Sequence, residues 1–250
     1  MADQNISHNA TKDFEVKGLP WWRLNFKVIG SEKQPLLIID NFFPTPSFLQ
    51  EEAEAAQFAK IAPYYPGERA VVQTPYLNIL MQGLTDPIVK LFDYSGGAKV
   101  EECFYSKLTT APEALNMVQR LPHIDGGHDD KVAILHYLCG PEFGGTAFYK
   151  QNATGFETVS NDRFQAYKDA IYKEHDALGP PDAAYFNESD NRFEKIAEVE
   201  AKYNRAIVYF GRNLHAVLPG KTDFKRAKET PLDISKTRLT VNTFISPQSK

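Results

Sequence analysis

Short apolar runs, separated by turns rich in glycine and proline, dominate the hydrophobic pattern of the chain. The runs that we expect to form strands are rich in β-branched and aromatic residues and comprise residues 36–40, 100–107, 131–138, 144–149, 205–210 and 238–245. Because turn signals separate these short strands, the pattern is typical of an antiparallel barrel or jelly roll.

Helical patterns support this sheet at several places. One helix is expected from Ser47 to about Lys60, with Ser47 as its cap, and a shorter one over Pro112–Arg120. Residues 61–100 are rich in proline and glycine and predict turns with short elements between them. Residues 157–202 are charged and aromatic, with helical periodicity.

The pattern therefore predicts a mainly β fold with flanking helices. Residues 157–202 leave the strand region and rejoin it, so we interpret them as a helical insertion and residues 1–250 as a single jelly-roll domain. The insertion could be a lid over the barrel mouth, or padding on the outside of the sheet.

Composition narrows the classes of function. The chain has 250 residues, 28 Lys+Arg against 32 Asp+Glu and a net charge of −4, which argues against a nucleic-acid partner. Cys103 and Cys139 lie far apart, so neither a disulfide framework nor a thiolate zinc site is expected. Residues 1–10 lack an apolar segment and no run is long enough to span a bilayer, so we expect a cytoplasmic protein without a membrane partner.

The motif His123-Ile124-Asp125 is the first candidate for chemistry. Residues i and i+2 of a strand face the same way, so His123 and Asp125 can point at one ion while Ile124 packs behind them. A His-x-Asp motif is common by chance, and His215 alone would be interpreted as a surface or capping histidine. Together they match the two-histidine, one-carboxylate triad of non-haem Fe(II) enzymes, which leaves coordination positions open.

A second unusual pattern lies in residues 238–245. By strand alternation Arg238, Thr240 and Asn242 share one face. Burying an unpaired arginine is costly, so this face is either an edge in solvent or the wall of an anion site. A guanidinium binds a carboxylate through two hydrogen bonds, and a neighbouring hydroxyl can add a third.

These residues resemble the Fe(II)/2-oxoglutarate-dependent oxygenase superfamily and, within it, the prolyl-4-hydroxylase-like branch or a bacterial branch with no known substrate. The matching segments follow the order of that family between Leu36 and Ile245 and comprise Leu37–Phe43, His123-x-Asp125, Ala133–Leu138, Gly144–Phe148, Leu214–Val217 and Arg238-x-Thr240.

The resemblance implies a double-stranded β-helix, the cupin-like jelly roll, and an oxygenase that hydroxylates an amino acid, a peptide or protein side chain, or a small metabolite. It implies that Fe(II) is the metal, 2-oxoglutarate the co-substrate and O2 the oxidant. By the same resemblance the metal ligands are His123, Asp125 and His215. The residues implied to bind 2-oxoglutarate are Arg238, Thr240 and Tyr137.

Several assignments stay open. Arg226, which is closer to His215 in the sequence, is a rival anchor for 2-oxoglutarate, although no predicted strand holds it. His128, followed by two aspartates, could form a second metal cluster, but a solvated loop is favoured. His136 faces away from Tyr137 and is expected to be packed or at the surface.

Two other classes of function also remain. One is a cupin-type metal enzyme that does not use 2-oxoglutarate, and the other is a jelly-roll protein that binds a ligand without catalysis. In each case the expected partner is a small molecule or a peptide, and a homodimer remains open.

Overall fold

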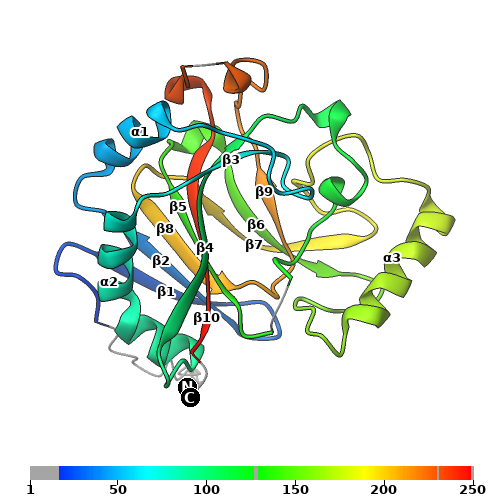
Figure 1. Cartoon of the computed structure of the whole chain (residues 1–250). Helices are drawn as coiled ribbons and strands as arrows, with labels where there is room; N and C mark the ends of the chain where they lie inside the picture. The colour runs from blue at the N-terminus through cyan, green and yellow to red at the C-terminus, as the bar shows by residue number, and fades with distance from the viewer. Residues whose placement is uncertain (1–16, 127–128, 230, 249–250) are drawn as a thin grey trace, which may run out of the picture.

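Two antiparallel sheets face each other in the computed structural model, which describes residues 17–126, 129–229 and 231–248 (Figure 1). The large sheet has the strand order β1-β2-β8-β5-β10-β4-β3, and the small sheet has the order β7-β6-β9. The strands are β1 (Arg23–Ile29), β2 (Gln34–Asp40), β3 (Gly67–Val71), β4 (Ala98–Leu108), β5 (Val132–Tyr137), β6 (Gly145–Gln151), β7 (Phe193–Glu200), β8 (Arg205–Phe210), β9 (His215–Leu218) and β10 (Leu239–Pro247).

The order of the strands identifies the fold. From β4 onward the chain alternates between the sheets: β4 is in the large sheet, His123 bridges to β9 in the small sheet, and β5 returns to the large one. β6 and β7 are in the small sheet, β8 in the large, β9 in the small and β10 in the large. This is the winding of a double-stranded β-helix, and it confirms the predicted jelly roll.

Each central strand of the large sheet is buried on both faces. In β5, Ile134 packs in the outer core beneath the helices, whereas Leu135 and Tyr137 pack in the inner core between the two sheets. A strand covered on both sides reads as a continuous apolar run, which is why β5 and β8 were predictable. The alternation of β5 also turns His136 outward.

Two helices cover the outer face of the large sheet, α1 (Pro46–Ala55) and α2 (Thr74–Phe92) (Figure 1). Leu80, Leu84 and Ile88 of α2 follow a helical period and pack in the outer core. The prediction that residues 61–100 are mostly turns was therefore wrong. Pro75 is tolerated because it lies in the first turn, while Pro87 lies inside the helix, where proline usually interrupts one.

Smaller corrections concern the other predicted helices. α1 begins at Pro46 after Thr45 and ends at Ala55, so Ser47 does not cap it and the helix is shorter than expected. The expected helix over 112–120 is two single 3-10 turns, Pro112–Ala114 and Val118–Arg120. Three more 3-10 turns occur at Pro141–Phe143, Arg226–Lys228 and Ile234–Lys236.

The predicted insertion is only partly helical. Its first half contains α3 (Phe164–Leu178), as the periodicity indicated, but residues 193–200 form β7. β7 pairs with β6 through a register shift at Phe148/Tyr149, so it belongs to the jelly roll itself. Phe193 and Val199 are buried on this strand. The charged residues between them produced the helical pattern that led to the wrong prediction.

Two further expectations concern chemistry and location. Cys103 and Cys139 are both buried as free thiols, as the sequence predicted. Among the residues that the structure describes, no helix combines the length and apolarity that crossing a bilayer would require.

Candidate active site

Three side chains with metal-binding atoms meet between the sheets. The ligand atoms of His123, Asp125 and His215 all lie within 4.8 Å of one another. Nε2 of His215 is 3.5 Å from Oδ2 of Asp125, and the two imidazole centroids are 4.4 Å apart. The structure thus brings together the three residues that the sequence singled out as metal ligands.

The backbone explains this convergence. The N–H of His123 donates to the carbonyl of His215 at 2.8 Å, and the N–H of His215 donates back at 2.9 Å. The N–H of Asp125 donates to the carbonyl of Gly211 at 2.8 Å. Ile124, between the two ligands, packs in the cluster on the outer side of the small sheet. The expected alternation of this motif is confirmed.

The donor set suits a divalent cation. Nδ1 of His215 lies 2.8 Å from the carbonyl of Asn213, and because a carbonyl only accepts, Nδ1 carries the proton. With the proton on Nδ1, Nε2 is the ring nitrogen available to a metal next to Asp125, and the hydrogen bond from Nδ1 to a carbonyl is a common way of orienting metal-binding histidines. Oδ2 of Asp125 is buried with no hydrogen-bond partner in the described part of the chain. A cation would satisfy both atoms.

The pKa shifts of His123 and Asp125 agree with this. Enclosure by the barrel wall, followed by the charges of His215 and Arg69, lowers the pKa of His123 although part of the residue is open to solvent. Burial raises the pKa of Asp125, against the opposing effects of His215 and Arg69. A lowered pKa favours the neutral imidazole of His123, which keeps a lone pair for a metal, and a cation would compensate the desolvated carboxylate of Asp125.

Arg238 is buried on the same side of the large sheet. It lies next to the start of β10 with 2% of its surface exposed, and Nη2 donates to the carbonyl of Gly145 on β6 at 3.0 Å. The guanidinium lies 5.5 Å from the ring centroid of Tyr137. Its Nε has no hydrogen-bond partner among the described residues. Arg238 is therefore between the sheets, with an unsatisfied donor.

Thr240 and Tyr137 are cross-strand partners on this inner face. The hydroxyl of Tyr137 lies 2.8 Å from that of Thr146, and Thr240 donates to Oδ1 of Asn242 at 2.7 Å. Burial raises the pKa of Tyr137 to about 12, so its phenol stays protonated. Both hydroxyls are on the inner face of the large sheet and already have protein partners.

The rival Arg226 has a different environment. It is in the 3-10 turn Arg226–Lys228, its side chain is 54% exposed, and Nε lies 3.9 Å from a carboxylate oxygen of Asp223. Water and this carboxylate already solvate its charge. The structure brings Arg238, and not Arg226, to the space between the sheets.

Sequence reasoning missed four residues of this interior. The hydroxyls of Tyr65 and Ser106 and Nε of Arg69 are buried without hydrogen-bond partners in the parts of the chain that are described. Tyr209 packs edge-on against the ring of His215, with centroids 5.0 Å apart. Burial raises the pKa of Tyr209, with Asp125 raising it further and Arg238 lowering it, so Tyr209 lies within the influence of both the triad and the buried arginine.

A pattern in β4 and β8 could have pointed to two of these residues. Ser106 and Tyr209 follow the strand alternation that places neighbours on the inner face. Tyr65 precedes β3, and Arg69 lies within it. This five-residue strand has no alternation of apolar and polar residues that would show which face each side chain is on.

Another described histidine, His136, lies away from this site. His136 is buried in the outer core, stacked on Tyr76, with Nε2 3.0 Å from Oδ1 of Asn204. Burial lowers its pKa to about 3. Of the two expected environments, packed or at the surface, the structure shows the packed one. His128 lies outside the described residues.

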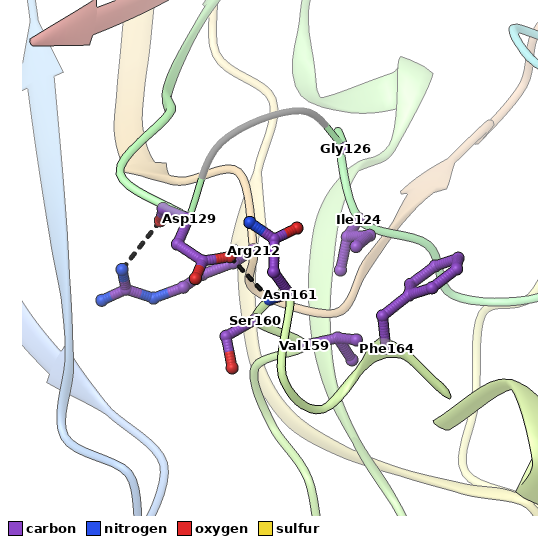
Figure 2. A pocket seen from close by; sticks show the side chains of 8 residues that line it. All are labelled: Ile124, Gly126, Asp129, Val159, Ser160, Asn161, Phe164 and Arg212. Carbon is purple, nitrogen blue, oxygen red and sulfur yellow. Dashed lines mark hydrogen bonds between the residues drawn. The ribbon is translucent and has the colours of Figure 1, made fainter. Parts of the chain in front are cut away.

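A pocket of about 230 Å³ lies on the other side of the His-x-Asp segment. Figure 2 shows Ile124 and Phe164 on one side of it and Asp129 with Arg212 on the other. The carbonyl of Asp129 accepts from Arg212 at 2.8 Å, and its carboxylate accepts from the N–H of Asn161 at 2.7 Å (Figure 2). Asp129 thus ties its loop to the start of the insertion.

Comparison with known proteins places this chain in a family. Residues 20–245 match DUF6445, which is described as a family of unknown function. The chain belongs to DUF6445. Among curated proteins, none matches this DUF6445 chain significantly.

Solved structures resemble the DUF6445 chain at low identity. HygX from Streptomyces hygroscopicus, with nickel, 2-oxoglutarate and hygromycin B bound, is 11% identical over 87% of this chain and 84% of HygX, with a TM-score of 0.49. A prolyl hydroxylase from Trichoplax adhaerens, in complex with a peptide of the hypoxia inducible factor oxygen degradation domain, is 12% identical over 85% of this chain and 83% of its own, with a TM-score of 0.47.

Proposed function

We propose that this DUF6445 chain is an Fe(II)- and 2-oxoglutarate-dependent oxygenase that hydroxylates a small molecule or a peptide. His123, Asp125 and His215 would hold the metal. Arg238 would bind the far carboxylate of 2-oxoglutarate, with Thr240 and Tyr137 beside it.

One observation carries the proposal: a two-histidine, one-carboxylate cluster and a buried arginine with a free donor share the interior of one jelly roll. Two histidines and a carboxylate leave three coordination positions of an octahedral metal open, as in non-haem Fe(II) oxygenases. A bidentate co-substrate and O2 together need three such positions. Arg238 supplies the opposite charge that the remaining carboxylate of a dicarboxylic keto acid requires.

The cost of the buried arginine supports the same conclusion. A desolvated guanidinium with an unsatisfied Nε destabilises the folded state unless an anion occupies the site. Nη2 is fixed by the carbonyl of Gly145, which restrains the plane of the guanidinium. The unpartnered hydroxyls of Tyr65 and Ser106 offer further hydrogen bonds to an anion held there. Tyr65 lies close enough to Arg238 for that charge to lower its pKa against the effect of burial.

The bound Fe(II) and 2-oxoglutarate would supply the activation of O2, with one oxygen atom entering succinate as CO2 leaves and the other entering the substrate as a hydroxyl. The protein's contribution is to bind, orient and exclude water. Asn213 fixes the ring of His215 through Nδ1, and the rings of Tyr209 and Phe148 pack around that histidine. These rings would shield the His215 side of a bound metal from water.

Metal binding and co-substrate turnover test the proposal. Binding of Fe(II) is measured without oxygen for the wild type, Asp125→Ala and His215→Ala, with Asp223→Ala as a control carboxylate outside the cluster. We expect one ion per wild-type chain and a loss of affinity of at least about 100-fold in the two ligand variants, because second-shell changes alone cost 10- to 100-fold. Formation of succinate from 2-oxoglutarate and O2 should require Fe(II) and stop in both variants.

The outcomes separate the three classes of function. Metal binding without any 2-oxoglutarate binding would contradict the proposal in favour of a cupin-type enzyme that does not use this co-substrate. If the chain binds neither the metal nor 2-oxoglutarate, a jelly-roll protein that binds a ligand without catalysis would be favoured.

A further inference from the structure

A second arginine with an unsatisfied donor is on the inner face of the large sheet. Arg69 is in β3, and its side chain is only 12% exposed. Ala70 packs in the outer core, so strand alternation turns Arg69 toward the inner side, opposite Ser106 of β4. Its Nε has no hydrogen-bond partner among the residues that the structure describes.

The surroundings of Arg69 resemble a ligand site more than a structural ion pair. The guanidinium lies 4.6 Å from the ring centroid of Tyr65 and 5.7 Å from that of Phe104, which gives it an aromatic wall. Its Nη1 is 4.0 Å from Oε2 of Glu102, beyond hydrogen-bond distance, and the Glu102 side chain is 50% exposed. This contact leaves Nε without a hydrogen-bond partner among the described residues, and a planar anion could accept its hydrogen.

Arg69 shares the inner face with residues of the proposed 2-oxoglutarate site: it pairs with Ser106 of β4, and Ser106 pairs with Thr240 of β10. The positive charge of Arg69 acts on both His123 and Asp125. Arg238, by contrast, is bonded to Gly145 and faces Tyr137. Tyr65 is under the influence of both guanidinium groups. The interior therefore holds two guanidinium groups, and the far carboxylate of one 2-oxoglutarate molecule needs only one of them.

We infer that Arg69 binds a carboxylate of the substrate, and that the substrate of this site is a carboxylate-bearing molecule with an apolar part. The inference rests on the proposed function, because it assigns the second cationic site to the molecule that is oxidised. Tyr65 and Phe104 contact the apolar part next to the carboxylate. Glu102 disfavours a doubly charged phosphate at this position, since its carboxylate adds a like charge nearby.

Calorimetry with phenylacetate and phenylacetamide tests the assignment. These probes differ only in whether the planar group is charged, and their ring suits the aromatic wall. They are titrated into the full chain loaded with Mn(II) and 2-oxoglutarate, in wild type, Arg69→Gln, Arg69→Lys and Arg226→Gln. Phenylacetate should bind wild type at least about tenfold more tightly than phenylacetamide, because a charge-assisted hydrogen bond is lost with the amide.

Arg69→Gln should bind both probes equally, Arg69→Lys should retain part of the preference, and Arg226→Gln should retain all of it. Thermal unfolding of each variant shows whether it is folded. Absence of a preference in wild type, or an unchanged preference in Arg69→Gln, would overturn the inference.

The same samples separate this inference from the proposed function. Binding of 2-oxoglutarate to Arg69→Gln should stay within about threefold of wild type, since no charge-assisted bond to it is removed. A collapse of that binding would mean that Arg69 anchors the co-substrate, which overturns the inference. If wild type binds neither Mn(II) nor 2-oxoglutarate, the proposed function fails, and the probe titrations repeated without them still decide the role of Arg69.

Discussion

The two faces of the large sheet treat buried polar groups in opposite ways. On the outer face, His136 is enclosed by Tyr76 and Asn204 and has polar neighbours for both ring nitrogens. On the inner face, Arg69 and Arg238 each retain an Nε without a partner in the described chain. Two adjacent residues of β5 therefore differ: His136 belongs to the satisfied outer core, and Tyr137 belongs to the interior between the sheets.

This difference distinguishes a face where protein contacts satisfy the buried polar groups from a face where buried donors lack a protein partner. A satisfied polar network contributes to the uniqueness of a core, whereas an unsatisfied buried donor costs stability. On the outer face, both ring nitrogens of His136 already have protein neighbours. On the inner face, Nε of Arg69 and Nε of Arg238 need a ligand to complete their hydrogen bonds. Substitutions on the outer face should therefore change stability and leave binding of 2-oxoglutarate unchanged. Substitutions on the inner face should weaken that binding with little change in stability.

The largest expected effect is a pH dependence of stability that comes from the outer face. The folded pKa of His136 is about 3, well below the ordinary value of 6.5. Below pH 6.5 the unfolded chain takes up a proton that the folded chain does not, so stability is lost as the pH falls, by about 1.4 kcal/mol per unit until about pH 3. Between pH 7 and pH 5, wild type should lose about 2 kcal/mol more than His136→Phe in urea unfolding.

His136→Phe serves as the matched variant because it removes the titrating group and keeps a ring in the outer core. Equal losses in the two proteins would show that His136 is protonated in the folded state, and the contrast between the faces would fail. Binding of 2-oxoglutarate should be the same in both proteins at pH 7.

The next effect concerns the inner face. Arg238→Met should lower the affinity for 2-oxoglutarate by about tenfold or more, because charge-assisted hydrogen bonds contribute roughly 1.5–3 kcal/mol. Without ligand, its free energy of unfolding should change by less than about 1 kcal/mol, since the lost bond to Gly145 is offset by relief of a desolvated charge. Calorimetry and urea unfolding measure the two quantities.

Arg226→Met is the control for this variant, and neither quantity should change in it. If Arg226→Met weakened binding of 2-oxoglutarate and Arg238→Met did not, the assignment of the anchor would be reversed. A large destabilisation of Arg238→Met with unchanged binding would make Arg238 a structural residue.

The smallest effect is expected for Tyr137→Phe. Its hydroxyl is bonded to Thr146, so its removal affects the anion site through one neutral hydrogen bond worth about 1 kcal/mol. The affinity for 2-oxoglutarate should fall by about fivefold or less. Tyr149→Phe, which removes a hydroxyl in the cluster outside the small sheet, should leave it unchanged. A loss as large as that of Arg238→Met would give Tyr137 a primary role in binding.

The sequence predicted those parts of the fold and the site that depend on local pattern. The run at 205–210 coincides with β8 because both faces of that strand are buried. The alternation of His123 and Asp125 is a backbone property, and the structure has it. The roles of these residues and of Arg238 remain proposals, although their positions agree with the prediction.

Other parts could not be predicted because tertiary contacts override the local signal. α2 contains Pro87, which predicts an interruption, yet the apolar face of this helix covers the outer core. β7 carries glutamates and lysine at spacings that suit a helix, and its pairing with β6 makes it a strand. Arg69 lies in a short strand whose facing is set only by its partner β4.

The reciprocal hydrogen bonds between His123 and His215 join positions that are ninety-two residues apart in the sequence. Bringing such distant segments together carries a loop-closure entropy that a metal ion would have to offset if the ion itself did the joining. Here the folded backbone has already closed the loop. Arrival and departure of an ion then leave the topology intact, so metal exchange in this barrel should be a local event with no need for global unfolding.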